Sequence, residues 1–103
     1  MQEINPIELK ERLDNGEPIQ LIDVRETFEH QAYNIGGKLI PLGEIMQHME
    51  AFNEPQPTVV YCRKGIRSMI AIQRLEAKLG ELPLYNLSGG IEAWMNMLDR
   101  ESH

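Results

Sequence analysis

Short apolar runs along the chain have the length and composition of buried β-strands. Isoleucine, leucine and valine dominate Ile19–Val24, and β-branched residues dominate Thr58–Tyr61, which has the strongest strand propensity. A third run covers Leu84–Leu87, and a briefer one at Leu39–Ile40 is stopped by Pro41. These runs predict three strands and one short additional strand.

Between these runs, apolar residues recur at helical spacing. Asn5-Pro6 supplies a cap and a first-turn proline for a helix that ends at Asn15-Gly16. A short helix fits Glu26–Tyr33, because Gly36-Gly37 follows it as a break. Three further helices are predicted. One covers residues 42–52, and one runs from the loop after residue 62 to about Lys78, with Gly80 as its C-cap. The last begins after Gly89-Gly90 and ends at about Leu98.

The alternation of strands and helices predicts an α/β fold with a small, open, parallel β-sheet and helices on both faces. The chain of 103 residues forms a single domain, 1–103, because no linker or repeat divides it. Ligands of such folds gather outside the carboxyl ends of the strands. Asp23 and Cys62 both lie at such ends.

Composition argues against several classes of function. Hydrophobic residues make up 42% and charged residues 25% of the chain, and the net charge of −6 argues against nucleic-acid binding. The N-terminus lacks a signal-peptide pattern, and no apolar run approaches the roughly 20 residues of a membrane span. One cysteine permits no internal disulfide, and with three histidines it predicts no metal site. We therefore expect a cytoplasmic protein that binds neither membrane nor metal.

The single cysteine, Cys62, has an unusual setting. It follows a predicted strand and precedes a predicted helix, where loop N–H groups and the helix dipole stabilise a thiolate. Arg63, Lys64 and Arg67 bring positive charge, and Gly65 allows a backbone turn in which N–H groups converge on an anion. The alternative is a cysteine that only packs in the core. The polar residues that follow at once favour a reactive thiol.

Several segments together resemble the single-domain rhodaneses, a family of sulfurtransferases. Cys62-Arg63-Lys64-Gly65-Ile66-Arg67-Ser68 is similar to their active-site loop, and Asp23-Val24-Arg25 to the end of one of their strands. Ile40-Pro41-Leu42 and the segment from Tyr85 to Trp94 resemble two further signatures. Asn34 stands where many relatives carry a histidine. The matches keep the family's order from about residue 4 to residue 98.

The resemblance implies a three-layer α/β/α rhodanese-like fold and a thiosulfate sulfurtransferase that works through a Cys62 persulfide without a cofactor. It implies a small anionic sulfur donor and, as acceptor, a thiol, cyanide or a sulfur-carrier protein. Loop N–H groups from Arg63 to Arg67 would hold the persulfide. The substrate-binding residues would be Arg63, Lys64, Gly65, Ile66, Arg67 and Ser68, with Asp23 and Arg25 in support and Asp23 the one expected to line the site.

Two other functions remain open at this point. Cysteine-dependent phosphatases resemble this fold, but their loop places five residues between cysteine and arginine, whereas four separate Cys62 from Arg67. A rhodanese-like interaction module without catalysis is the second alternative. Such modules often lack the loop cysteine, which this chain retains.

Overall fold

The computed structural model describes residues 1–102. The strands are β1 (Gln2–Ile4), β2 (Gln20–Asp23), β3 (Lys38–Leu39), β4 (Thr58–Tyr61) and β5 (Leu84–Leu87). The α-helices are α1 (Pro6–Asp14), α2 (Thr27–Ala32), α3 (Ile66–Leu79) and α4 (Gly90–Glu101), and two 3-10 helices, η1 (Leu42–Gln47) and η2 (Met49–Phe52), lie between β3 and β4.

The five strands form one parallel sheet in the order β1-β5-β4-β2-β3. Strand β4 is central, and all four of its residues are buried. Its register pairs Tyr61 with Asp23 of β2 and Val60 with Asn86 of β5. The carboxyl ends of these three strands therefore meet at one edge of the sheet, as parallel pairing requires.

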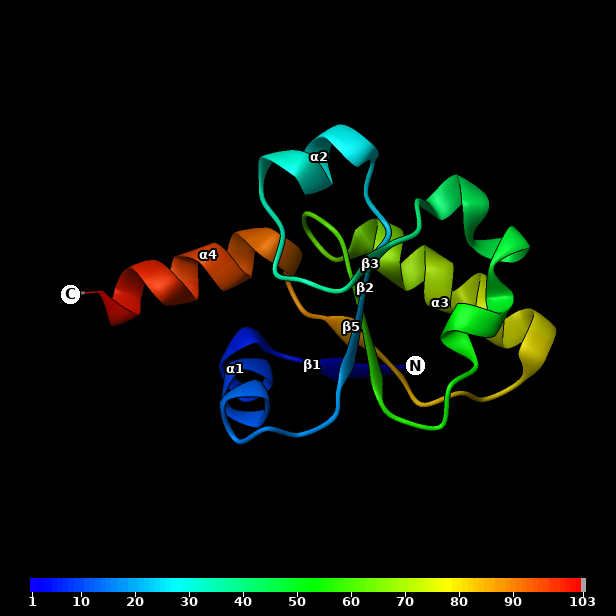
Figure 1. Cartoon of the computed structure of the whole chain (residues 1–103), viewed down its shortest axis with the longest axis horizontal. Helices are drawn as coiled ribbons and strands as arrows, with labels where there is room; N and C mark the ends of the chain where they lie inside the picture. Colours follow the sequence, from blue (N-terminus) through cyan, green and yellow to red (C-terminus); the bar gives the residue numbers. More distant parts are fainter. Residues whose placement is uncertain (103) are drawn as a thin grey trace.

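Helices cover both faces of the sheet, which makes three layers (Figure 1). Helices α1 and α4 lie on one face, where Leu9, Tyr61, Leu87 and Trp94 belong to one apolar core. Helix α3, η1 and η2 lie on the other, over a core to which Cys62 contributes. At the strands' carboxyl edge, α2, the loop after β4 and the start of α4 come together (Figure 1). The predicted α/β fold with helices on both faces is confirmed.

Apart from shifts of one to three residues in the bounds of some elements, the structure differs from expectation in two places. Residues 42–52 form two 3-10 helices and not one α-helix, with the break at His48. Ile45 and Phe52 are buried there, whereas Met46 is exposed. The spacing of apolar residues thus predicted a helical segment but did not distinguish a 3-10 helix from an α-helix. Strand β1 was not predicted, because only Ile4 of its three residues is buried and pairing with β5 defines it.

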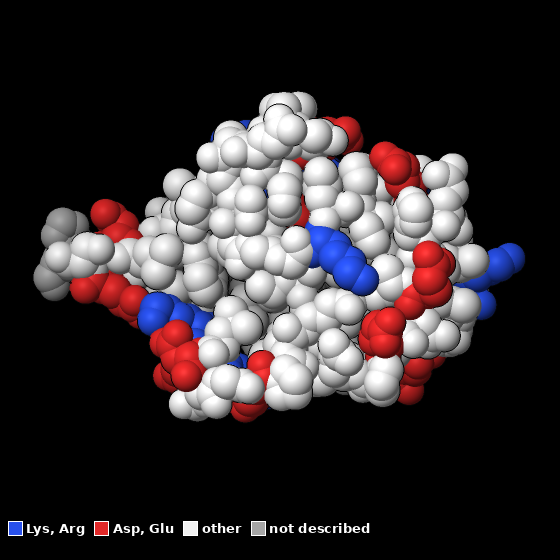
Figure 2. Space-filling model, in the orientation of Figure 1, with Lys and Arg blue, Asp and Glu red and all other residues white. Residues whose placement is uncertain are grey.

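Charged side chains are unevenly spread over the surface. On the face in Figure 2, acidic side chains lie over η1 and η2, which carry the exposed Glu44 and Glu50, and also around α1 and the end of α4, where basic side chains lie among them. Of the helices in residues 1–102, none has the length and apolar character needed to cross a bilayer.

Candidate active site

Cys62 is the residue directly after β4, and its side chain is only 1% exposed. The sulfur accepts hydrogen bonds from the backbone N–H groups of Gly65, at 3.1 Å, and Ser68, at 3.4 Å. The hydroxyl oxygen of Ser68 lies 3.3 Å from the same sulfur. Two converging N–H groups stabilise negative charge at that atom.

Gly65 gives the loop its shape. It takes the left-handed conformation, with φ of +94°, and caps the N-terminus of α3. A side chain is disfavoured there, and a Cβ would also lie 3.4 Å from the carbonyl oxygen of Leu87 and from the nitrogen of Gly89. The turn brings the positive end of the 14-residue helix α3 toward the sulfur.

A small hollow adjoins Cys62 despite the burial of this residue. Its volume is about 190 Å³, and it is lined by Cys62, Arg63, Lys64, Ile66 and Arg67. A broader groove of about 680 Å³ adjoins it between α2 and α4 and shares Arg63 and Arg67. The exposed side chains of Phe28 and Met95 line that groove. Cys62 is therefore covered by the loop and yet lines a cavity.

Two of the three loop cations are held by acidic partners. Arg63 Nε donates to Glu92 of α4 at 2.9 Å, and Arg67 makes two hydrogen bonds to Glu29 of α2, at 2.7 and 2.9 Å. The hydrogen bonds from Arg67 lower the pKa of Glu29 to about 2. Within residues 1–102, Lys64 makes no ion pair, so its charge remains available at the hollow.

The start of α4 holds the loop from its other side. The N–H of Ile91 donates to the carbonyl of Cys62 at 2.9 Å, and that of Glu92 donates to the carbonyl of Arg63 at 3.1 Å. This contact needs Gly90, because a Cβ there would lie 2.5 Å from the carbonyl oxygen of Arg63 and closer still to that of Cys62. Gly90 also has φ of +61°.

Asp23 and Arg25 form a buried network beside the site. Arg25 donates to Asp23 at 2.8 to 3.2 Å and to the carbonyl of Tyr33 at 2.6 Å. Nδ1 of His30 lies 2.9 Å from Asp23 Oδ2. Asp23 is fully buried, whereas Arg25 lines the broader groove, which differs from the expectation that Asp23 would line the site. Their contacts tie the end of β2 to α2.

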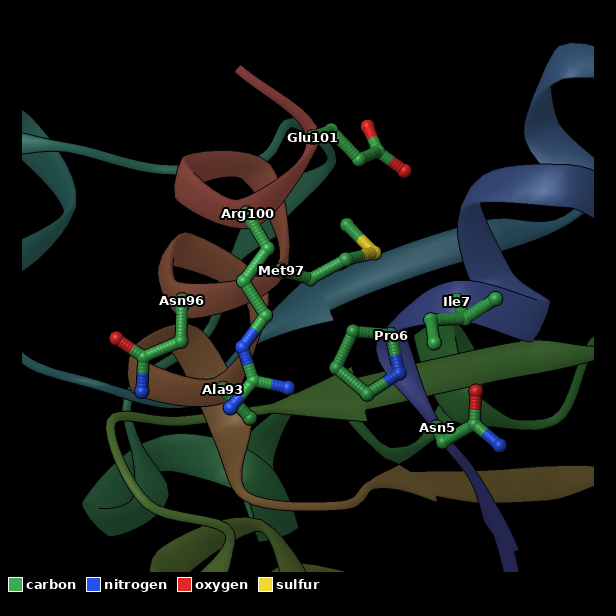
Figure 3. A pocket seen from close by; sticks show the side chains of 8 residues that line it. All are labelled: Asn5, Pro6, Ile7, Ala93, Asn96, Met97, Arg100 and Glu101. Atoms are coloured by element: carbon green, nitrogen blue, oxygen red, sulfur yellow. The ribbon is translucent and has the colours of Figure 1, made fainter. Parts of the chain in front are cut away.

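A separate hollow of about 460 Å³ lies between the start of α1 and the end of α4 (Figure 3). Side chains of α4, among them Met97, face Pro6 and Ile7 of α1 across it. It shares no lining residue with the hollow at Cys62, and its lining holds no cysteine or histidine. Residues 1–102 contain no cluster of three or more His, Cys, Asp or Glu side chains placed for a metal ion.

Comparison with known proteins identifies the architecture. The family model of the rhodanese-like domain matches residues 5–97. This chain belongs to that family. A rhodanese-like domain protein from Staphylococcus aureus has a similar crystal structure, with a TM-score of 0.81, 35% identity and 91% of each chain covered.

Relatives of this rhodanese-like domain include one that is named as a putative sulfurtransferase. The putative sulfurtransferase YtwF of Bacillus subtilis is 34% identical over 91% of this chain and 90% of its own length. The uncharacterized protein YqhL of the same organism is 40% identical over 73% of this chain. The chain spans 60% of YqhL and a quarter or half of the next curated relatives it matches.

The structure of the rhodanese-like domain brings most of the expected site residues together. Cys62, Arg63, Lys64, Ile66 and Arg67 line one hollow, while Gly65 and Ser68 contact the sulfur directly. Sequence reasoning assigned no role in this loop to four residues from distant segments: Glu29, Asn86, Gly90 and Glu92. Asn86, Gly90 and Glu92 lie within the segment from Tyr85 to Trp94 that resembles a family signature, so the sequence marked their positions without giving their structural roles.

Proposed function

We propose that this rhodanese-like domain is a sulfurtransferase in which Cys62 carries sulfur as a persulfide. The observation that supports this most is the setting of Cys62. Its sulfur accepts hydrogen bonds from two backbone N–H groups, and the residue lines a hollow together with three cationic side chains. Such a setting favours a thiolate, which is the nucleophilic form of cysteine. Relatives named as a putative sulfurtransferase and a putative sulfur carrier protein agree with this chemistry.

The reaction has two displacement steps. In the first, the Cys62 thiolate attacks the outer sulfur of thiosulfate; the new S–S bond forms as the bond to sulfite breaks, and sulfite leaves with its electron pair. In the second, an acceptor nucleophile attacks the outer sulfur of the persulfide, and the Cys62 thiolate leaves. With cyanide as acceptor, the product is thiocyanate. Each step exchanges one nucleophile for another, so neither needs an oxidant or a reductant.

The protein's contribution is electrostatic. The Gly65 and Ser68 N–H groups stabilise the thiolate before attack and again when it leaves. The first-turn N–H groups of Ile66 and Arg67 then remain for the outer sulfur or for the donor's oxygens. Lys64, which has no ionic partner in residues 1–102, supplies the cation for an anionic donor.

The acceptor class follows from the space beside the hollow. The groove between α2 and α4 has room for a thiol compound or the end of a carrier protein, both much larger than cyanide. With a single cysteine, the persulfide cannot be resolved within the chain, so an external acceptor is required. A thiol that must stay reduced fits a cytoplasmic setting.

Intact mass spectrometry tests the proposal. After thiosulfate treatment, the wild-type protein should gain the mass of one sulfur atom and lose it when cyanide is added. The C62S variant should gain nothing and should release no thiocyanate. A C62S protein that still releases thiocyanate at the wild-type rate would contradict the assignment. The S102A variant is the matched control, because the Ser102 hydroxyl donates to the carbonyl of Leu98 and not to the sulfur or its neighbours.

The same proteins test the phosphatase alternative. The loop between Cys62 and Arg67 has one residue fewer than that of phosphatases, which favours sulfur over a tetrahedral phosphate ester. We expect hydrolysis of an aryl phosphate to be slower than sulfur transfer from thiosulfate. Hydrolysis that is faster, and lost in C62S, would favour the phosphatase. If neither activity is found and the mass is unchanged, the interaction module is favoured.

A further inference from the structure

Asn86 of β5 is a buried polar residue that contacts the Cys62 loop from beneath. Only 3% of it is exposed. Its amide nitrogen donates to the carbonyl of Gly65 at 3.1 Å and to Glu3 at 3.3 Å. Both of those partners are acceptors, so the nitrogen must point toward them. The amide oxygen consequently faces the hydroxyl of Ser68, at 2.5 Å.

This orientation determines where the Ser68 proton lies. A serine hydroxyl has one proton to donate, and an amide oxygen can only accept. Ser68 therefore donates to Asn86, and its lone pairs face the Cys62 sulfur 3.3 Å away. In this arrangement Ser68 can accept from a thiol S–H but gives no hydrogen bond to a thiolate.

We propose that Asn86 is a positioning residue for sulfur transfer, acting through Gly65 and Ser68. It anchors the Gly65 peptide that turns an N–H toward the sulfur, and it withholds the Ser68 proton from that sulfur. The thiolate then has two hydrogen bonds and not three. Because a less stabilised thiolate is a stronger nucleophile, this arrangement favours attack on the donor. The inference rests on the proposed role of Cys62.

Alkylation of the lone cysteine by iodoacetamide tests this without any sulfur transfer. The rate follows the thiolate fraction, so it is measured across pH for wild type, S68A, N86A and the double variant. In wild type, Ser68 acts as an acceptor for the thiol; S68A should therefore raise the rate about threefold at the acidic end of the profile. In the N86A background, the freed hydroxyl donates to the thiolate, so S68A should lower the rate about tenfold there.

The reversal of sign is the result that supports the proposal. A fall in rate caused by S68A in both backgrounds would overturn it, because Ser68 would then donate to the sulfur regardless of Asn86. Equal increases in both backgrounds would overturn it too. If N86A loosens the loop, it does so both in N86A and in the double variant, so this effect cancels when their alkylation rates are compared. If N86A does not fold, S68A alone decides: faster alkylation supports the proposal and slower alkylation contradicts it.

Other charges near the sulfur stay constant across this set of variants. They are Arg63, Lys64 and Arg67 of the loop, with Glu29 and Glu92 on the two arginines and Glu3 on Asn86. S102A is again the matched control, and it should give the wild-type pH profile of alkylation in either background. Because alkylation needs no sulfur donor or acceptor, the two proposals can fail separately. A wild-type protein that releases no thiocyanate but shows the sign reversal would disprove the sulfurtransferase and leave the effect of Asn86 on the reactivity of Cys62 standing.

Discussion

Replacement of Gly90 by alanine should damage both the fold and the candidate site. The new Cβ would lie 2.5 Å from the carbonyl oxygen of Arg63 and closer to that of Cys62, and these are backbone atoms that cannot rotate away. The left-handed φ of +61° adds about 1–2 kcal/mol for a residue with a side chain. Relief of the overlap adds about 1–3 kcal/mol, as in other overpacked sites.

The two contributions together predict that G90A lowers the free energy of unfolding by about 2–5 kcal/mol, a large part of the roughly 5–15 kcal/mol of a domain this size. Gly16 supplies the matched control. It has φ of +77°, but a Cβ there meets nothing within 4 Å. G16A should therefore show only the conformational part, about 1–2 kcal/mol. The difference between the variants isolates the contact with the loop.

Urea unfolding followed by the fluorescence of Trp94 measures these changes, because this buried residue is the only tryptophan. Thiocyanate release is measured alongside on folded protein. Since G90A must shift the Cys62 carbonyl by several tenths of an ångström, we expect its activity to fall at least about tenfold while G16A retains it. Equal losses of stability and activity in G90A and G16A would refute the close contact between α4 and the loop.

Three further predictions concern the charges and hydroxyl groups around the site. E29Q should lower the free energy of unfolding above about pH 4.5, where Glu29 is ionised in both the folded and the unfolded chain. The difference in free energy of unfolding between E29Q and wild type should shrink as the pH falls toward the Glu29 pKa of about 2. A difference that stays constant with pH in urea titrations would contradict the ion pair with Arg67. K64A should raise the KM for thiosulfate more than R67A does, in steady-state assays at two salt concentrations, because Lys64 is the one of the three loop cations that makes no ion pair in residues 1–102. Equal KM values for wild type and K64A would exclude Lys64 from donor binding. Y61F should unfold about 1 kcal/mol more easily in urea, since Tyr61 donates to the carbonyl of Gly36 at 2.9 Å; unchanged stability would show that this bond contributes nothing.

The strands that position the site could be predicted from the sequence because their signals are local. Both Thr58–Tyr61 and Leu84–Leu87 are observed with the predicted bounds. Apolar residues bounded by polar turns define such strands without knowledge of their neighbours. The position of Cys62 at a strand end and of Gly65 in a turn followed in the same way.

The partners of the loop could not be predicted, because they depend on which distant segments the fold brings together. Arg67 pairs with Glu29, which lies 38 positions earlier in the chain, and Arg63 pairs with Glu92, 29 positions later. Asn86 reaches the loop only because β5 pairs with β4. A run of cations in a sequence shows charge, but whether each is neutralised is decided by tertiary contacts.

The hydrogen bonds between α4 and the Cys62 loop have a consequence for biosynthesis. A ribosome releases residues from the amino end, so Cys62 emerges before Asn86, Gly90 and the amides that bind its own carbonyl and that of Arg63. A nascent chain therefore displays a bare thiol with none of these supports. The site should therefore become competent only when α4 folds back against the loop.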